Sequence, residues 1–153
     1  MISVRSTLTA LSIAAAALTL SAIETRAAES HTVTVYKTPW CGCCKVWTEA
    51  LENAGYTIDA RDLEDLDPIK RQARVPEELE ACHTATIDGY VLEGHVPLQA
   101  IDKLFEERPD VIGISVPGMP AGSLGMGYDE DARYTVYSFT GDAGPAVFHE
   151  AGK

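Results

Sequence analysis

Three cysteines lie within four consecutive positions, Cys41-Gly42-Cys43-Cys44. Core packing alone does not require so many neighbouring thiols. As thiolates, side chains at this spacing can exchange disulfides or hold a soft metal ion. Cys41 and Cys44 form a CxxC pair, which would serve a thiol–disulfide oxidoreductase with Cys41 attacking and Cys44 resolving. Cys43 argues against that interpretation, because a third thiol between the two could form competing disulfides.

Further along the chain are soft ligands that simple disulfide exchange would not need. Cys82 is a candidate thiolate, although it could also be a core cysteine or pair with Cys43. His83 follows directly, and neighbours in an extended chain point to opposite faces, so both reach one site only where the backbone turns. His95 is a candidate imidazole ligand whose alternative role is to cap the helix that begins near Pro97.

Two methionines lie in a segment too rich in glycine to build much core, residues 118–127. A methionine in such a loop is either an exposed apolar residue or a thioether ligand, so Met119 and Met126 join the candidate ligands. Thiolate, thioether and imidazole together favour Cu(I), whereas zinc would leave the methionines unexplained. Adjacent cysteines suit bridging thiolates, so the site has room for more than one copper ion.

The elements that must position these residues alternate between strand and helix. The patterns predict strands at 32–36, 56–60 and 134–139, and a hairpin over 84–93 around Asp88-Gly89. They also predict a helix from Cys41 that ends at Gly55, a helix over 62–73 interrupted by Pro68, one helical turn at 75–79, and a helix over 97–107. Residues 111–126 are expected to be a loop, and the tail after Gly141 is weakly specified. This order predicts an α/β fold: a single thioredoxin-like domain with a mixed sheet flanked by helices.

The first 27 residues have the features of a secretory signal peptide. Arg5 precedes an apolar run over 8–20, and Thr25-Arg26-Ala27 offers small residues at the −3 and −1 positions of a cleavage site. We therefore expect a mature domain over 28–153 in the periplasm, where disulfides are allowed. An uncleaved N-terminal anchor is the alternative. No later segment is apolar enough to predict a membrane span in the mature chain.

The charge balance is strongly acidic. The 12 basic and 23 acidic residues of the chain become 10 and 22 without Arg5, Glu24 and Arg26, which is a net charge of −12. Such a surface repels nucleic acid and anionic lipid and weakly attracts cations. Nucleic acid is therefore not an expected partner. High solubility alone also explains this balance.

Several blocks of the sequence resemble the exported metal-binding proteins of the CopG copper-resistance type, a family formerly known as a domain of unknown function. The blocks are Val35-Tyr36-Lys37, Cys41-Gly42-Cys43-Cys44, Cys82-His83-Thr84-Ala85, Gly89-Tyr90-Val91, Glu93-Gly94-His95-Val96-Pro97, Val116-Pro117-Gly118-Met119-Pro120 and Gly125-Met126. They cover most of the predicted mature chain in the family's order. One departure is Leu124, where that family more often has proline.

The resemblance implies a thioredoxin-like fold, a periplasmic location and copper held by a cysteine-rich cluster. It supports a ligand set made of Cys41, Cys43, Cys44, Cys82, His95, Met119 and Met126. The predicted function is a periplasmic protein of copper resistance that sequesters or transfers Cu(I), with copper redox activity as an extension. Other periplasmic copper-handling proteins are its expected partners. The alternatives are a periplasmic thiol–disulfide oxidoreductase and, from a third class, a disulfide-stapled structural module.

Overall fold

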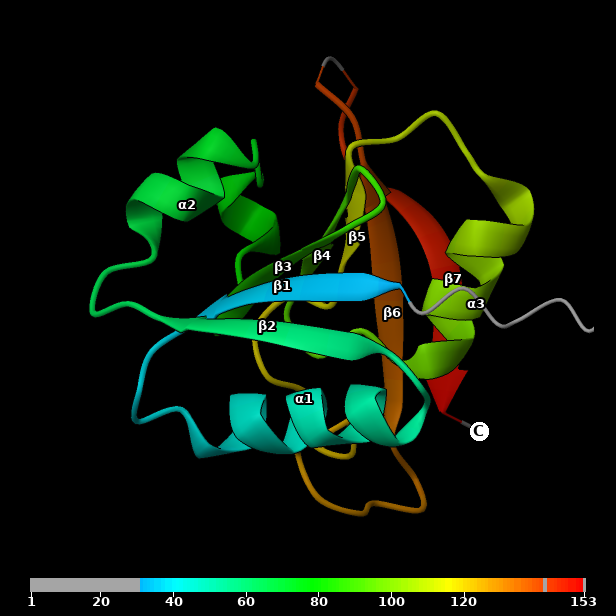
Figure 1. Ribbon diagram of the computed structural model, residues 1–153. Helices are drawn as coiled ribbons and strands as arrows, with labels where there is room; N and C mark the ends of the chain where they lie inside the picture. The colour runs from blue at the N-terminus through cyan, green and yellow to red at the C-terminus, as the bar shows by residue number, and fades with distance from the viewer. Residues whose placement is uncertain (1–30, 142, 153) are drawn as a thin grey trace, which may run out of the picture.

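A mixed sheet with the strand order β2-β1-β3-β4-β5-β6-β7 runs through the computed structural model, which describes residues 31–141 and 143–152 (Figure 1). The predicted signal segment, residues 1–27, lies outside the described residues. The strands are β1 (Thr32–Lys37), β2 (Thr57–Asp62), β3 (His83–Ile87), β4 (Tyr90–Glu93), β5 (Gly113–Ser115), β6 (Arg133–Phe139) and β7 (Ala146–Gly152). The helices are α1 (Gly42–Asn53), α2 (Asp67–Gln72) and α3 (Leu98–Glu107), with a 3₁₀ turn, η1, at Glu77–Leu79.

The first strand, helix and second strand form the unit that carries the cysteines. β1 pairs with β2 in parallel and with β3 in antiparallel fashion. Residues of β1 alternate in burial, and Val33 and Val35 are fully buried. Helix α1 packs Trp47 and Leu51 against these valines, so its first turn is held near the end of β1. Gly55 follows the helix in a left-handed conformation (φ 97°), as its predicted place after the helix end requires.

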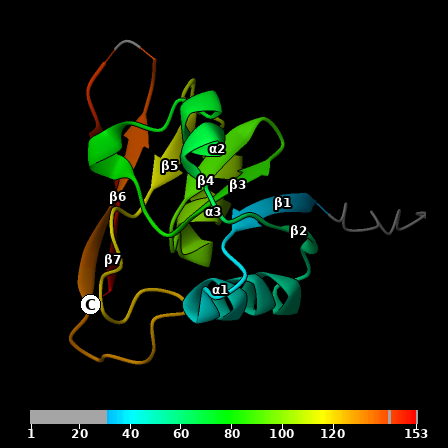
Figure 2. The ribbon, with the colours of Figure 1, turned by 90° about the vertical axis from the view of Figure 1, so that its left-hand side faces the viewer.

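The helices cover both faces of the sheet. Val91 and Leu92 are neighbours in β4 and therefore point to opposite faces. Leu92 belongs to the main core with side chains of α1 and α3, whereas Val91 packs with Val75, Leu79 and Phe139 on the other side. Accordingly, α1 and α2 lie on opposite sides of the strands when the structure is viewed from two directions (Figures 1 and 2). The predicted α/β class, mixed sheet and flanking helices are confirmed.

The predicted hairpin forms as the sequence indicates. β3 and β4 pair antiparallel, with Ile87 opposite Tyr90, and the two residues between them have φ angles of 48° (Asp88) and 87° (Gly89). Positive φ at both positions is the mark of the two-residue turn that matches strand twist. The hairpin brings Glu93, at the end of β4, beside Thr84, the second residue of β3.

Two strands were not predicted. β5 lies inside the segment expected to be a loop, and three residues are too few to show a period. Its Gly113 packs so closely on β4 that a Cβ atom would lie 2.2 Å from the Val91 carbonyl oxygen. β7 occupies the weakly specified tail, where an edge strand with mostly exposed side chains shows little alternation. The thioredoxin-like arrangement stays a prediction. Within the part of the chain described, no helix is long and apolar enough to cross a membrane.

Candidate metal centre

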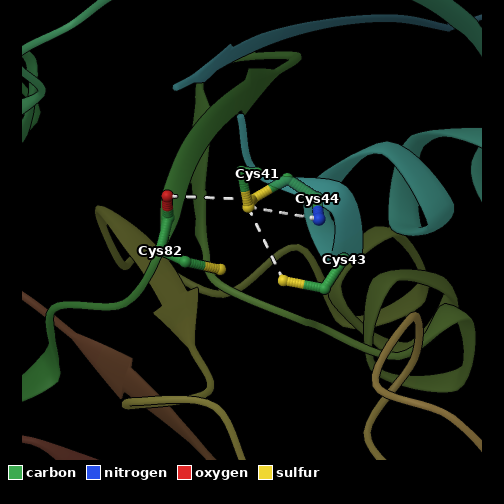
Figure 3. A group of neighbouring side chains, drawn as sticks. All are labelled: Cys41, Cys43, Cys44 and Cys82. Carbon is green, nitrogen blue, oxygen red and sulfur yellow. Dashed lines mark hydrogen bonds between the residues drawn. A yellow bond between two sulfur atoms is a disulfide. The ribbon is translucent and has the colours of Figure 1, made fainter. Parts of the chain in front are cut away.

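The four cysteines gather where α1 begins. Cys41 caps the helix, Cys43 and Cys44 lie in its first turn, and Cys82 directly precedes β3. The four sulfur atoms all lie within 4.8 Å of one another (Figure 3). Cys41 and Cys44 are joined by a disulfide, the Cys43 sulfur lies 3.6 Å from that of Cys41, and Cys43 and Cys82 are free thiols. The structure thus brings together every cysteine that the sequence nominated.

Cys41 caps α1 and is the more accessible member of the disulfide. Its sulfur accepts a hydrogen bond from the Cys44 backbone N–H at 3.3 Å, in the place of the oxygen of an ordinary N-cap residue. Backbone N–H groups at a helix N-terminus favour a thiolate over a thiol. Cys44 is fully buried, and its sulfur lies 3.8 Å from the Cys82 carbonyl oxygen. An incoming thiol or metal ion therefore reaches Cys41 before Cys44.

Two histidines extend the sulfur cluster into the protein. Cys44, Cys82, His83 and His95 also have one ligand atom each within 4.8 Å of one another. The Cys82 sulfur lies 3.0 Å from Nε2 of His95 and 3.4 Å from Nδ1 of His83. On the far side of its ring, His95 Nδ1 donates to the Leu124 carbonyl oxygen at 2.6 Å. Because a carbonyl can only accept, the proton of neutral His95 lies on Nδ1, and the Nε2 lone pair faces the sulfur.

The sequence leaves open whether His83 is a ligand, because His83 and Cys82 reach one site only where the backbone turns. The backbone bends at Cys82, just after Ala81 forms an isolated bridge with Gly118, and this bend turns both side chains to one site. His83 is fully buried against Trp47, with ring centroids 4.4 Å apart. Its Nε2 has no hydrogen-bond partner among the described residues. The sequence signal was its adjacency to Cys82, but the bend could not be inferred from sequence.

Burial controls the protonation of these groups. Burial, together with the neighbouring Cys43, raises the pKa of the Cys82 thiol to about 12. Burial and the nearby His95, Lys70 and Lys37 lower the pKa of His83 well below its usual value. Burial also lowers the pKa of His95. At neutral pH the metal-free site therefore presents neutral imidazoles, ready to bind a metal, and a thiol that must release its proton when a metal ion binds.

The methionine loop lies against the site through its backbone. A Cβ on Gly125 would lie 2.8 Å from the Cys43 carbonyl oxygen and 3.2 Å from His95 Nδ1, so the loop touches both halves of the site there. Met126 is the next residue and is partly buried. Met119 follows Gly118, the bridge partner of Ala81, and its side chain is 56% exposed. Each methionine therefore directly follows a glycine that lies near the cysteine–histidine cluster or its flanking backbone, and the role of both as ligands stays a prediction.

The predicted helix-capping alternative for His95 does not hold. Helix α3 begins after Pro97, which makes no side-chain hydrogen bond to the helix, and His95 is fully buried between Cys82 and Leu124. His31 and His149 are not part of the cluster. His149 lies in β7, and His31 Nδ1 lies 2.6 Å from a carboxylate oxygen of Asp88.

Comparison with solved structures identifies relatives of known name. One, titled "Copper resistance protein copG- Form 2", matches with a TM-score of 0.75 and 38% identity over 80% of this chain and 99% of that chain. The chain belongs to the CopG copper-resistance family. A second CopG structure, Form 1, matches with a TM-score of 0.75 and 37% identity over 82% of this chain and 100% of that chain.

A family model described as a protein of unknown function, DUF411, matches residues 79–126, which contain Cys82, both site histidines, Met119 and Met126. A comparison with curated proteins found no match. The CopG assignment therefore rests on the solved structures and the family model together. It agrees with the resemblance seen in the sequence blocks, and it accords with a cysteine cluster that could hold a metal ion.

Proposed function

We propose that this CopG-family protein binds Cu(I) in the periplasm and sequesters it or hands it on during copper stress. The observation that carries the proposal is the convergence of four cysteine sulfurs within 4.8 Å at the start of α1. Thiolates are the ligands that select Cu(I), and the two neutral imidazoles beside them are compatible with the same ion. Cys43, which lies between the disulfide partners and 3.6 Å from the Cys41 sulfur, would bridge copper ions.

Full loading requires reduction of the Cys41–Cys44 disulfide. In the reduced protein all four cysteines could ligate Cu(I). In the oxidised protein Cys43, Cys82 and the two histidines would remain. The predicted leader over residues 1–27 supports export to the periplasm, where a reducing partner or a copper-handling protein would supply the electrons or the metal.

A thiol–disulfide or copper redox activity is a second candidate, and the disulfide itself favours it. When the thiolates of Cys41 and Cys44 form their S–S bond they give up two electrons, enough to convert two Cu(II) ions to Cu(I). The accessible Cys41 and buried Cys44 are the arrangement expected for an attacking and a resolving thiol.

The test is an anaerobic Cu(I) titration of the reduced mature protein against a competing chelator. We expect Cys43→Ser to bind fewer copper ions and to show fewer sulfur neighbours by X-ray absorption. His149→Ala, which changes a histidine of β7 away from the cluster, is the matched control and should bind like the parent. Equal and weak binding by the parent and Cys43→Ser would refute the proposal. Unchanged disulfide turnover in Cys43→Ser, with turnover lost in Cys41→Ser, would favour the redox candidate.

A further inference from the structure

A buried ion pair lies beneath the segment that carries Cys82. Lys70 of α2 and Glu93 at the end of β4 form a salt bridge, with side chains 6% and 0% exposed. The Lys70 ammonium also donates to the Ala81 carbonyl oxygen at 2.9 Å and to the Thr84 hydroxyl oxygen at 3.2 Å. All three of its N–H donors therefore have partners. The ion pair joins three elements that are separate in sequence.

Glu93 completes the network from the other side. Its Oε1 accepts the Ala81 backbone N–H at 2.7 Å, and its Oε2 accepts the Thr84 hydroxyl at 2.6 Å. Both backbone groups of Ala81 are thus bound by the pair, the N–H by Glu93 and the C=O by Lys70. Gly94, the residue after Glu93, also lies close to Ala81: a Cβ on Gly94 would lie only 2.5 Å from the Ala81 side chain.

The position of Ala81 decides where the Cys82 sulfur lies. Ala81 is outside β3, and its bridge to Gly118 is an isolated one outside the named strands, so the strand ladder does not fix it. Consecutive Cα atoms are about 3.8 Å apart, and a displacement of Ala81 passes directly to its neighbour. The 3.0 Å approach of the Cys82 sulfur to His95 and its place beside Cys43 leave little room for such a displacement.

A buried ion pair is poor evidence for stability, because desolvation of the two charges offsets much of their attraction. A pair of well-packed apolar side chains would fill the same space. What apolar side chains cannot supply are the two hydrogen bonds to Ala81. The contribution specific to the Lys70–Glu93 pair is therefore the orientation of the Ala81 backbone through these hydrogen bonds.

We propose that Lys70 and Glu93 are positioning residues that hold Cys82 within reach of Cys43 and His95. The copper consequence of this proposal rests on the proposed function. The positioning itself does not, because it can be measured in the metal-free protein.

The first measurement uses no metal. In a Cys41→Ser/Cys44→Ser background, the remaining thiols of Cys43 and Cys82 are oxidised with diamide, which takes up their two electrons and two protons as the S–S bond forms. The rate of closure reports how often the two sulfurs meet. We expect Lys70→Met/Glu93→Leu to slow closure roughly tenfold or more, because an intramolecular reaction depends steeply on the placement of its groups.

Matched variants separate positioning from loss of stability. Leu104→Ala weakens the main core through α3, away from Ala81, and should close at the parent rate. Lys70→Met/Glu93→Gln keeps an acceptor for the Ala81 N–H but loses the donor to its C=O, so it should close at an intermediate rate. If the Lys70→Met/Glu93→Leu protein does not fold, the closure rate of Lys70→Met/Glu93→Gln provides the test instead. Closure at the parent rate in the folded double variants would overturn the proposal.

The second measurement is Cu(I) affinity with all four cysteines present. Loss of groups that orient a ligand commonly lowers metal affinity about 10–100-fold, and we expect a decrease of this size for Lys70→Met/Glu93→Leu, with one sulfur neighbour fewer by X-ray absorption. If the parent fails to bind Cu(I) while closure is still slowed, the proposed function is wrong and the positioning role stands. If copper affinity falls but closure does not slow, the positioning role is wrong.

Discussion

Substitution of Gly125 by alanine should damage both the stability of the fold and the metal site. Gly125 has φ 91°, a conformation that L-residues rarely adopt, and its missing Cβ leaves room for the backbone of α1. A Cβ there would lie 2.8 Å from the Cys43 carbonyl oxygen and 3.0 Å from the Trp47 backbone nitrogen. Both are main-chain atoms of one helix, so neither can move alone.

The expected loss has two physical sources. A left-handed conformation costs an L-residue roughly 1–2 kcal/mol, and overpacking against fixed atoms adds about 1–3 kcal/mol, so we expect Gly125→Ala to lose about 2–5 kcal/mol. The loop could relieve the contact by moving outward. That movement would break the 2.6 Å hydrogen bond from His95 to the Leu124 carbonyl and free the imidazole ring to turn.

The assay is urea unfolding of the metal-free protein with the Cys41–Cys44 disulfide intact, followed by Cu(I) competition on the reduced protein. Gly55→Ala is the backbone control, because Gly55 has a similar φ of 97° and no atom near its Cβ position. Gly144→Ala, at an exposed glycine with open space around it, should change stability by less than about 0.5 kcal/mol. A Gly125→Ala protein no less stable than Gly55→Ala would refute the steric argument.

Two further predictions concern the buried rings beside the cysteines. Burial lowers the pKa of His83 in the folded chain, so the unfolded chain takes up the proton first as the pH falls below about 6.5. The free energy of unfolding of the metal-free parent should therefore fall by up to about 1.4 kcal/mol per pH unit relative to that of His83→Leu. Urea unfolding of both proteins from pH 7 to 5.5 measures this difference, and a constant gap would contradict it; the raised pKa of Glu93 acts in the opposite direction but is common to both. Trp47→Phe should lower the free energy of unfolding, measured by thermal unfolding, by about 2–4 kcal/mol. The reason is that the buried Val96 carbonyl loses the indole N–H that donates to it at 2.9 Å. A loss below about 1 kcal/mol would show that water replaces the donor.

The parts of the fold that were predictable are those with a local signal. The period of β1, the glycine after α1 and the Asp88-Gly89 turn each follow from a few adjacent residues. β5 and β7 carry no such signal, because one is three residues long and the other is an exposed edge strand. Their positions are set by the strands they join.

The candidate site divides in the same way. The residue types of the cysteines and of His95 sufficed to nominate them, because so many soft ligands in a short chain are unusual. His83 could not be assigned, since its direction depends on a bend after Ala81. Lys70 and Glu93 were equally hidden, because charged side chains are usually exposed and only the tertiary structure shows which two are buried together.

Because the cysteines are far apart along the chain, a copper ion bound by all of them would protect the protein from proteolysis. Cys82 is 38 residues from Cys44, and the two meet only because β1 and β3 pair, with Lys37 opposite His83. An unfolded chain offers the CxCC thiols but not the complete ligand set, so a bound ion favours the native state. At a free copper concentration 100 times the dissociation constant this linkage is about 2.7 kcal/mol. A protease that cleaves the opened chain would then spare loaded molecules and remove empty ones, so the abundance of the protein would follow the supply of its metal.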